Sequence, residues 1–592
     1  MRSALCILLL ATAAPAWSQV DPLAPTPPAS AEPLVIEPAV QDQLPTAAPV
    51  LPPVIVRPVP KDWRGVFDAI RAEDWGGVVA GINALPDGPL KPVALAEYYT
   101  ARTGPRIELG PILALLAEAP DLPQAEQLQR LAMLRGAIEP PAIVTPRPTI
   151  GLPMAPRRGR ARPVSGEPAA DALRLALEPM VKADDAVGAE ALLIEQLPYL
   201  SFEARAEAAQ RVAFIYYILG RDADVRRLAD QGRAGAVGEW ASQAAWVSGL
   251  AAWRMGDFGA AQAAFGDAMR QSGEPEFVAC AAYWGARAAQ AGRRPRDVQG
   301  LLLAAARSGE SFYGLLARET LGMATTIPAP RRFDSSRPVA RSANVRRASE
   351  LAAIGERSLA EQMLRHQAKI GSPADQQDLI AVARSLDLGG AQFWLAHNGQ
   401  PGTRVAAADR YPAPRWNPDN GWRIDPALAY AHVIQESNFR AEAVSPADAV
   451  GLMQVRPGTA GDTARARGQS VSVAALKRPE TNLDHGQAAI ELFRRSSATR
   501  GQLPRVIAAY NAGPVPVERW QYINDKGDPL LWIESLPYWE TRYYVPAVLR
   551  NMWVYQGLAG AAQPTLRALA EHRWPAFPTG TARISRIANM QP

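Results

Sequence analysis

From Trp63 onward, apolar residues recur at intervals of three and four, and short polar turns interrupt the pattern. This spacing places apolar side chains along one face of an α-helix, whereas a half-buried strand would alternate apolar and polar residues. No convincing alternating stretch occurs in the sequence. Because 48% of the residues are hydrophobic and only 20% are charged, the composition excludes a wholly disordered chain. The expected fold class is mainly α.

An internal repeat supports a helical array. Gly220, Gly256 and Gly292 are 36 residues apart, and each follows an aromatic-rich helical segment and precedes a polar turn and a second helical segment. Helix-turn-helix units with a period in the mid-thirties are typical of α-solenoids such as tetratricopeptide arrays. We therefore expect an α-superhelical solenoid. The aromatic residues, at helical spacing, are expected in its core rather than in a sugar site.

The N-terminus has the pattern of an export signal. Arg2 precedes an apolar stretch from Ala4 to Ala14, and Ala16-Trp17-Ser18 places small residues at the two positions that a signal peptidase reads. Cleavage after about Ser18 and export are expected. The alternative is an uncleaved membrane anchor, but the apolar run is shorter than the roughly 20 residues of a spanning helix. No stable membrane insertion is expected.

Proline-rich segments divide the rest of the chain. Residues 19–60 contain twelve prolines and no helical periodicity, so we expect an extended spacer. Residues 61–332 are expected to form the solenoid, with a Pro/Arg-rich break near 139–168. Residues 333–405 are expected to form a small helical linker domain, and residues 410–592 a C-terminal domain with more Trp, Tyr, Asn and Gly.

Charge and ligand-type residues exclude several function classes. A total of 63 basic against 58 acidic residues leaves a net charge of +5, spread along the chain. This small excess favours anionic partners such as nucleic acid, phospholipid or cell-wall polymer, and it does not specifically indicate nucleic-acid binding. Cys6 and Cys280 are the only cysteines, and His432 and His485 stand alone without metal-ligand spacing. With no phosphate loop or dinucleotide fingerprint, we expect neither a metal nor a cofactor.

One glutamate in the C-terminal region is a candidate acid. Asp425-Pro426 is a strong helix start, and the helix is expected to run to about Phe439. Glu436 follows His432 by one turn on a mostly apolar strip, where desolvation would raise its carboxyl pKa and make it a general acid. The alternative is a solvated ion pair with Arg440 at i,i+4, which would lower the pKa.

Several ordered motifs follow this glutamate. They are Ser445-Pro446, Gly451-Leu452-Met453-Gln454, Asn482-Leu483-Asp484-His485-Gly486, Ala508-Ala509-Tyr510-Asn511-Ala512-Gly513-Pro514 and Glu540-Thr541-Arg542-Tyr543-Tyr544-Val545. Together, from about Ile424 to Tyr555, they resemble the catalytic domain of the soluble lytic murein transglycosylases. Phe312-Tyr313-Gly314-Leu315-Leu316-Ala317 and the helical array are similar to the α-superhelical region of the family's periplasmic members.

The resemblance implies a lysozyme-like domain in which Glu436 is the single acid/base. Glu436 would protonate the glycosidic oxygen between N-acetylmuramic acid and N-acetylglucosamine, and its carboxylate would then deprotonate the muramyl 6-hydroxyl. That hydroxyl attacks the anomeric carbon and leaves a 1,6-anhydromuramyl end. Because the nucleophile is tethered to the substrate, no second carboxylate at the spacing of a retaining glycosidase is required.

The resemblance also implies residues that bind the substrate. Ser445 matches a position that contacts substrate near the acid, Gln454 would bind sugar or N-acetyl groups, and Tyr510 would orient Glu436 or the reacting sugar. Further candidates to line the cleft are Met453, Asn511 and Glu540. Each has a structural alternative: Met453 is favoured as core, Asn511 can end a helix, Tyr510 can be a buried aromatic, and Glu540 can pair with a surface arginine.

The leading hypothesis is an exported, exolytic or endolytic peptidoglycan transglycosylase. One rival is a muramidase with the same cleft that admits water and leaves a reducing end. The other is a non-catalytic envelope scaffold that binds glycan. Peptidoglycan strands are the expected partner, and the helical array offers a surface for envelope proteins.

Overall fold

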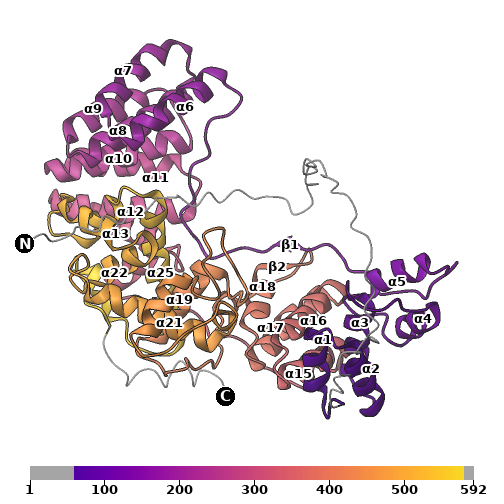
Figure 1. Cartoon of the computed structure of the whole chain (residues 1–592). Helices are drawn as coiled ribbons and strands as arrows, with labels where there is room; N and C mark the ends of the chain where they lie inside the picture. Colours follow the sequence, from indigo (N-terminus) through magenta and orange to yellow (C-terminus); the bar gives the residue numbers. More distant parts are fainter. Residues whose placement is uncertain (1–58, 579–592) are drawn as a thin grey trace, which may run out of the picture.

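The computed structural model describes residues 59–578, and it is almost wholly helical (Figure 1). The expected signal peptide and nearly all of the expected proline-rich spacer lie outside the described residues. Strands β1 (Ile150–Gly151) and β2 (Asn398–Gly399) form one short antiparallel pair. Two residues are too few to produce an alternating sequence pattern. Within residues 59–578, no helix is long and apolar enough to cross a membrane.

Two segments that are far apart in the sequence share one hydrophobic core. The first segment contains α1 (Trp63–Arg71), α2 (Trp75–Ala84), α3 (Leu90–Thr100), α4 (Leu109–Glu118) and α5 (Ala125–Leu134). The second contains α15 (Ala343–Ala353), α16 (Arg357–Ile370), α17 (Gln376–Ser385) and α18 (Gly389–His397). Val66, Leu128, Leu351 and Leu379 are fully buried in this common core. Residues 63–134 thus pack on the segment expected to be a linker domain, and the domain bounds themselves stay a prediction.

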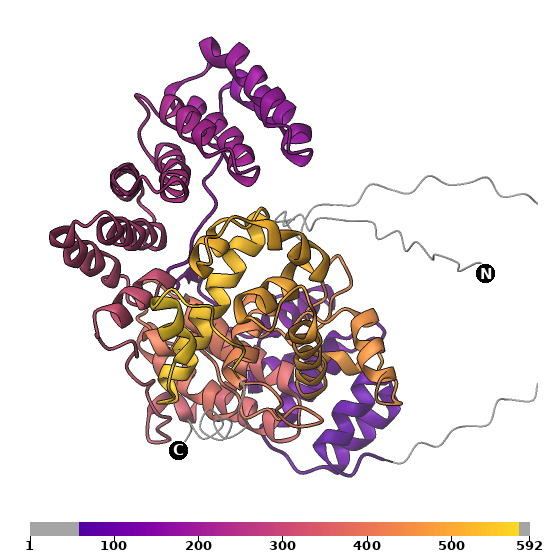
Figure 2. The same ribbon diagram turned by 90° about the vertical axis from the view of Figure 1, so that its left-hand side faces the viewer.

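The solenoid is a succession of helices that follow one another along a curve (Figure 2). Its helices are α6 (Pro168–Lys182), α7 (Ala186–Gln196), α8 (Phe202–Ile218), α9 (Asp222–Gly232), α10 (Glu239–Met255), α11 (Phe258–Gln271), α12 (Pro275–Ala291), α13 (Pro295–Ala306) and α14 (Phe312–Thr320). Each helix contacts the next, so a repeat unit buries its apolar face against its neighbours.

The repeat glycines lie in the turns within the pairs α8–α9, α10–α11 and α12–α13. Gly220 and Gly256 have φ angles of +76° and +77°, a left-handed conformation that costs glycine little. The aromatic residues before these turns are mostly core: Tyr217 and Trp284 are fully buried and Trp253 is half-buried. The expected solenoid and the expected role of its aromatic residues are therefore confirmed.

The C-terminal domain surrounds one buried helix, α19 (Pro426–Ser437). Helix α25 (Trp539–Leu558) packs along α19, and α22 (Leu503–Ala512) packs on α25. The other helices are α20 (Pro457–Arg465), α21 (Pro479–Arg495), α23 (Pro514–Arg519), α24 (Pro529–Glu534) and α26 (Pro564–Ala570). Short 3-10 helices are η1 (Leu197–Tyr199), η2 (Pro338–Arg341), η3 (Pro373–Asp375), η4 (Ala407–Arg410), η5 (Ala475–Lys477) and η6 (Trp520–Tyr522).

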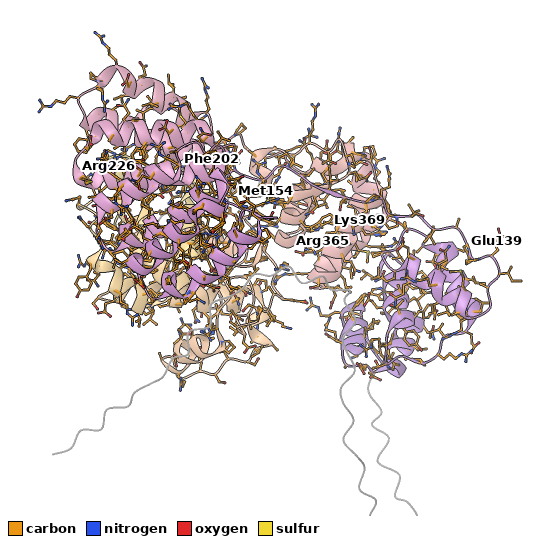
Figure 3. The ribbon with its side chains drawn as sticks, turned by 90° about the horizontal axis from the view of Figure 1, so that it is seen from above. Glu139, Met154, Phe202, Arg226, Arg365 and Lys369 are labelled. Atoms are coloured by element: carbon orange, nitrogen blue, oxygen red, sulfur yellow. The ribbon has the colours of Figure 1, made fainter. Side chains whose placement is uncertain are left out.

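Residues 135–167, which we call the strap, connect α5 with α6 across the molecule (Figure 1). Seen from above, the strap runs from near Glu139 past Met154 toward the solenoid (Figure 3). β1 lies in it and pairs with β2 beside α18. Further on, the side chain of Arg158 is buried between solenoid and C-terminal domain and forms an ion pair with Glu534 of α24 (Nη1 to Oε2, 2.6 Å).

Candidate active site

Helix α19 carries Glu436 at its half-buried C-terminal end. Asp425 caps the helix by accepting a hydrogen bond from the Ala427 amide, and Pro426 occupies the first turn. The helix ends at Ser437, two residues before the end expected from sequence, because Asn438 and Phe439 have φ angles of +52° and +63°. Glu436 thus lies in the last turn of a helix that is otherwise buried along most of its length.

The Glu436 carboxyl group is desolvated. Burial raises its pKa from an ordinary value of 4.5 to about 7. A hydrogen bond donated by Tyr544 Oη to Glu436 Oε1 (2.5 Å) lowers this pKa, and the negative charge of Glu540 raises it. Within residues 59–578, Glu436 and Arg440 form no ion pair, and Arg440 Nε instead donates to the Ser437 carbonyl oxygen. The environment matches the desolvated acid rather than the solvated ion pair.

Tyr544 is a site residue that the sequence analysis did not single out. It lies on α25, 108 residues after Glu436, and its side chain is buried. The only available signal was its place in the final motif, four residues after Glu540 and therefore on the same helical face. His432 contacts both tyrosines of the site, with ring centroids 4.7 Å from Tyr510 and 5.9 Å from Tyr544. Burial lowers the pKa of His432 to about 4, so this imidazole is neutral.

The loop after α19 is held by a single asparagine. Asn482 Nδ2 donates to the carbonyl oxygens of Val450 and Leu476 (both 2.8 Å), and its Oδ1 accepts from the Met453 amide (2.8 Å). Gly451 has φ +78°, and a Cβ there would lie 2.2 Å from Asn482 Nδ2. Asn482 therefore fixes the backbone that presents Met453 and Gln454.

The predicted residues of this loop differ in their surroundings. Met453 is fully buried and packs against Gly486, as the core alternative predicts. The amide of Gln454 donates to the carbonyl oxygens of Gly451 (2.9 Å) and Ala443 (3.3 Å). Ser445 Oγ accepts from the amides of two residues in its own turn. The side chains of Gln454 and Ser445 thus bond within the loop and do not contact the carboxyl group of Glu436 in the described structure.

Tyr510, Asn511 and Glu540 lie closer to the acid. Tyr510 Oη donates to the Met453 carbonyl oxygen (2.8 Å), and burial together with the Glu436 charge raises the Tyr510 pKa well above its ordinary value. Asn511 Nδ2 donates to Glu540 Oε1 (3.2 Å), and Asn511 Oδ1 accepts from Thr541 Oγ1 (2.6 Å). Glu540 is exposed, and its recorded partner is this amide rather than an arginine.

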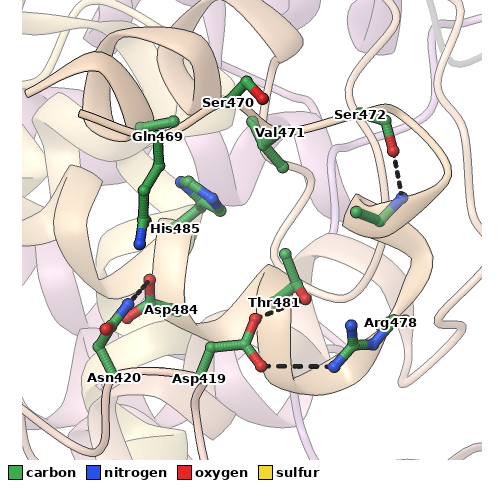
Figure 4. Close-up of a pocket in the computed structure, with 12 residues that line it drawn as sticks. Asp419, Asn420, Gln469, Ser470, Val471, Ser472, Arg478, Thr481, Asp484 and His485 are labelled. Carbon is green, nitrogen blue, oxygen red and sulfur yellow. Dashed lines mark hydrogen bonds and ion pairs between the residues drawn. The ribbon is translucent and has the colours of Figure 1, made fainter. Parts of the chain in front are cut away.

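Residues of the C-terminal domain take part in lining two cavities. A polar cavity of about 530 Å³ is formed around Asp484 and His485, and Glu436 does not line it (Figure 4). Asn420 bonds to Asp484, and Asp419 bonds to Thr481 and Arg478. None of the predicted substrate residues lines it. The other cavity, of about 810 Å³, lies where solenoid, strap and α25 meet, and Gln435, Glu540 and Tyr544 line it.

Side chains of the types that bind metal ions do not cluster in the part of the chain that the structure describes. No group of three or more His, Cys, Asp or Glu side chains there is placed to hold a metal ion.

The comparisons with known proteins agree with this arrangement. Residues 417–533 match the family described as "Transglycosylase SLT domain". The "Soluble lytic murein transglycosylase" of Escherichia coli (strain K12) is 36% identical over 157 residues, which are 26% of this chain and 24% of that protein. The "Endo-type membrane-bound lytic murein transglycosylase A" of Klebsiella pneumoniae (strain 342) is 32% identical over 117 residues, which are 16% of this chain and 58% of that protein.

Similarity of fold extends over more of the chain. The crystal structure of the 70-kDa soluble lytic transglycosylase from Escherichia coli superimposes with a TM-score of 0.50 and 17% sequence identity, over 87% of this chain and 99% of that chain. The sequence match, by contrast, spans about a quarter of the length of the Escherichia coli relative. The expected fold, an α-superhelix followed by a lysozyme-like domain, is confirmed.

Residues 417–533, which include Glu436, are therefore similar to the transglycosylase SLT domain. Over 157 residues the chain is also similar in sequence to a soluble lytic murein transglycosylase, as its motifs indicate.

Proposed function

We propose that this protein is a lytic transglycosylase that cleaves the β-1,4 bond between N-acetylmuramic acid and N-acetylglucosamine in peptidoglycan. The observation that carries the proposal is the Glu436 carboxyl group, which lies within the residues that match the SLT domain. This group is desolvated, has a pKa of about 7 and accepts a hydrogen bond from Tyr544. A carboxyl group with this pKa is about half protonated at neutral pH and mostly protonated at slightly lower pH, so it can act as a general acid there.

Glu436 acts first as an acid. Tyr544 donates to Oε1, so Oε2 carries the proton and gives it to the glycosidic oxygen as the bond to the anomeric carbon breaks. The same hydrogen bond stabilises the carboxylate that forms. Buried surroundings keep this carboxylate a strong enough base for the second step.

Glu436 then acts as a base. Its carboxylate removes the proton from the 6-hydroxyl of the muramyl sugar, and that oxygen forms the new bond to the anomeric carbon. The proton returns to Glu436, the product carries a 1,6-anhydro end, and no water is consumed. Tethering of the hydroxyl to the reacting sugar replaces an enzyme nucleophile. This scheme fits the exposed position of Glu540, which bonds to Asn511 and not to Glu436.

The other predicted residues position the loop and the side chains around this acid. Tyr510 is a positioning residue, because it fixes the Met453 carbonyl oxygen and lies close enough to sense the Glu436 charge. Gln454 and Ser445 present their loop to the glycan, and Asn511 with Glu540 forms the opposite rim. Met453 is a core residue that shapes the loop.

We propose a periplasmic location, with residues 1–18 as the removed signal and residues 19–60 as the spacer. Peptidoglycan strands are the partner of the C-terminal domain, residues 410–592. The helical array of residues 61–332 and the segment 333–405 confine or present these strands, and the array offers surface for envelope proteins.

The test compares two glutamates in one assay. Release of soluble fragments from purified sacculi is measured for the wild type, Glu436→Gln and Glu540→Gln. We expect Glu436→Gln to lose on the order of 10²–10⁴-fold in rate, because it removes the only acid. Glu540→Gln keeps activity within about tenfold, because it loses one exposed hydrogen bond. No release by folded wild type would instead support the scaffold, and equal losses in both variants would support a two-carboxylate mechanism.

A further inference from the structure

The two ends of the solenoid differ in what covers them. At one end, α14 packs on α25 and α26 of the C-terminal domain. At the other end, in the part of the chain that the structure describes, α6 and α7 pack on each other and on α8, and their outer sides are exposed (Figure 1). Because solenoid repeats bury apolar faces against their neighbours, a terminal repeat in a soluble array normally has a polar outer side.

The outer side of this terminal unit is instead apolar. Leu175 of α6 is 72% exposed, and Val187 and Ile194 of α7 are 61% and 57% exposed. Within each helix, the exposed apolar residues are three or four positions apart and so share one side, opposite the residues buried in the solenoid. We call this surface the end face, and it consists of Ala172, Leu175, Pro179, Val187, Ala191 and Ile194.

A row of alternating charges runs along α6 beside Leu175. Its members, Asp171, Arg174, Glu178 and Lys182, are three or four positions apart and lie along one strip of the helix. The side chains of Asp171, Glu178 and Lys182 are 52%, 56% and 72% exposed, whereas that of Arg174 is 25% exposed and also bonds to Glu207 of α8 (2.9 Å). The ion pairs within the row, Asp171 with Arg174 and Glu178 with Lys182, are surface pairs that contribute little to stability. They can therefore exchange partners on association.

The order of these charges is complementary to itself. Read along α6 it is negative, positive, negative, positive, and read backwards it is the reverse. Two α6 helices that lie antiparallel, with their midpoint between residues 176 and 177, bring Asp171 against Lys182 of the second copy and Arg174 against Glu178 of the second copy. A two-fold axis repeats each of these contacts. A parallel arrangement would place like charges opposite each other.

The apolar residues of α7 agree with the same two-fold axis. Val187 and Ile194 lie symmetrically about a point between residues 190 and 191, so antiparallel α7 helices bring Val187 of one copy against Ile194 of the other. The turn of residues 183–185 joins α6 to α7. Asp184 is about seven residues from both midpoints, so at ~1.5 Å per residue they lie at about the same level of the helix pair. One axis can therefore serve both helices.

We propose that two copies of this chain associate through the end face, as a two-fold dimer in which the first solenoid units stack antiparallel. The two helices, of 15 and 11 residues, are about 22 and 16 Å long and about 10 Å apart, so each copy buries roughly 400 Å². Because this area is at the low end for specific complexes, the dimer is weak, with a dissociation constant in the micromolar range. It joins two solenoids into one longer array and does not depend on the reaction of the C-terminal domain.

Sedimentation velocity of the full chain, from about 1 to 200 µM, tests the dimer. We expect a reversible monomer–dimer equilibrium for the wild type. Leu175→Asp should weaken it at least tenfold, because it places two carboxylates near the centre of the interface without partners. The matched control is Leu303→Asp, since Leu303 is an exposed leucine of α13 outside the end face. It should keep the affinity of the wild type, and circular dichroism checks that each variant is folded.

Charge reversal tests the antiparallel register. Lys182→Asp should weaken the dimer about tenfold, because it places like charges opposite each other twice. The double variant Asp171→Lys/Lys182→Asp should restore most of the affinity, because opposite charges meet again. A wild type that stays monomeric, a dimer that Leu175→Asp leaves intact, or a double variant no better than Lys182→Asp would overturn the proposal.

Discussion

At the scale of single residues, the chemistry depends on how the Glu436 carboxyl group is solvated. Burial raises its pKa, and the Tyr544 hydroxyl acts in the opposite direction by donating to Oε1. These opposing influences place the pKa at about 7, where one group can both give and accept a proton within a catalytic cycle. Both the stability of the fold and the rate of cleavage should therefore depend on the protonation of Glu436.

Glu436→Gln should stabilise the protein in a pH-dependent way. The folded-state pKa is raised, so the wild type is most stable relative to the variant below the ordinary pKa of 4.5 and loses stability as pH rises through about 7. The advantage of the variant should grow by about 3 kcal/mol across this window. Calorimetric unfolding of both proteins between pH 4.5 and 8 measures it. A constant difference would show that the carboxyl group titrates alike in folded and unfolded chains.

Tyr544→Phe should shift the pH dependence of cleavage upward. The hydroxyl lowers the Glu436 pKa, so its removal raises that pKa by roughly half a unit to one unit, and the alkaline limb of kcat moves with it. The rate itself should fall, because the carboxyl group loses its positioning partner. Rates from pH 5 to 9 test this, with Tyr522→Phe, which changes an exposed tyrosine, as the control. An unshifted limb would contradict the assigned role.

The sequence predicts Glu436 but not its partner. An apolar strip and a capped start place Glu436 on a buried helix, and both signals lie within a few residues of it. Tyr544 meets Glu436 only because α25 packs along α19, more than 100 residues later. Periodicity within one helix carries no information about which distant helix will face it.

At the scale of elements, the loop between α19 and α20 depends on Asn482 of α21. This side chain bonds to three backbone groups of the loop region and leaves no space beside Gly451. The sequence predicts the flexible glycine and the motif around it. It does not predict the hydrogen bonds of Asn482, because they join separate motifs. The early end of α19 has a local cause instead, because Asn438 adopts a left-handed conformation that asparagine tolerates.

Gly451→Ala should destabilise the domain by about 3 kcal/mol or more, because φ is +78° and the new Cβ would lie 2.5 Å from the Leu476 carbonyl oxygen. Activity should fall with it as the loop moves. The matched control is Gly458→Ala, since Gly458 lies on α20 with nothing within 4 Å of an added Cβ. Thermal unfolding compares the two. Equal melting temperatures for both variants would show that the close packing at Gly451 does not stabilise the loop.

At the scale of the whole molecule, the strap links parts that the sequence presents as separate. It pairs with β2 beside α18 and inserts Arg158 between solenoid and C-terminal domain. The composition predicts an irregular Pro/Arg-rich segment there. The position of that segment in the folded protein depends on long-range contacts, which composition does not predict. For the same reason, helical periodicity cannot predict that residues 63–134 and 343–397 share one core. The solenoid is readily predicted, because its repeats contact their neighbours in sequence.

Arg158→Met should destabilise this junction by about 3 kcal/mol or more, because Glu534 is left as a buried carboxylate without its cation. The double variant Arg158→Met/Glu534→Gln should regain part of the loss, since it removes the stranded charge. Calorimetry combined with limited proteolysis of the strap reports the effect, and Arg162→Met is the exposed control. An unaltered melting temperature in Arg158→Met would show that the strap is not held by this pair.

Under the proposed mechanism, Glu436 directs attack by a hydroxyl of the substrate and not by water. The most direct measurement is mass spectrometry of fragments released from sacculi in water enriched in ¹⁸O. We predict products one water lighter than hydrolysed fragments, without ¹⁸O, and their absence with Glu436→Gln. Reducing ends that carry ¹⁸O would contradict the account and identify a muramidase with the same acid.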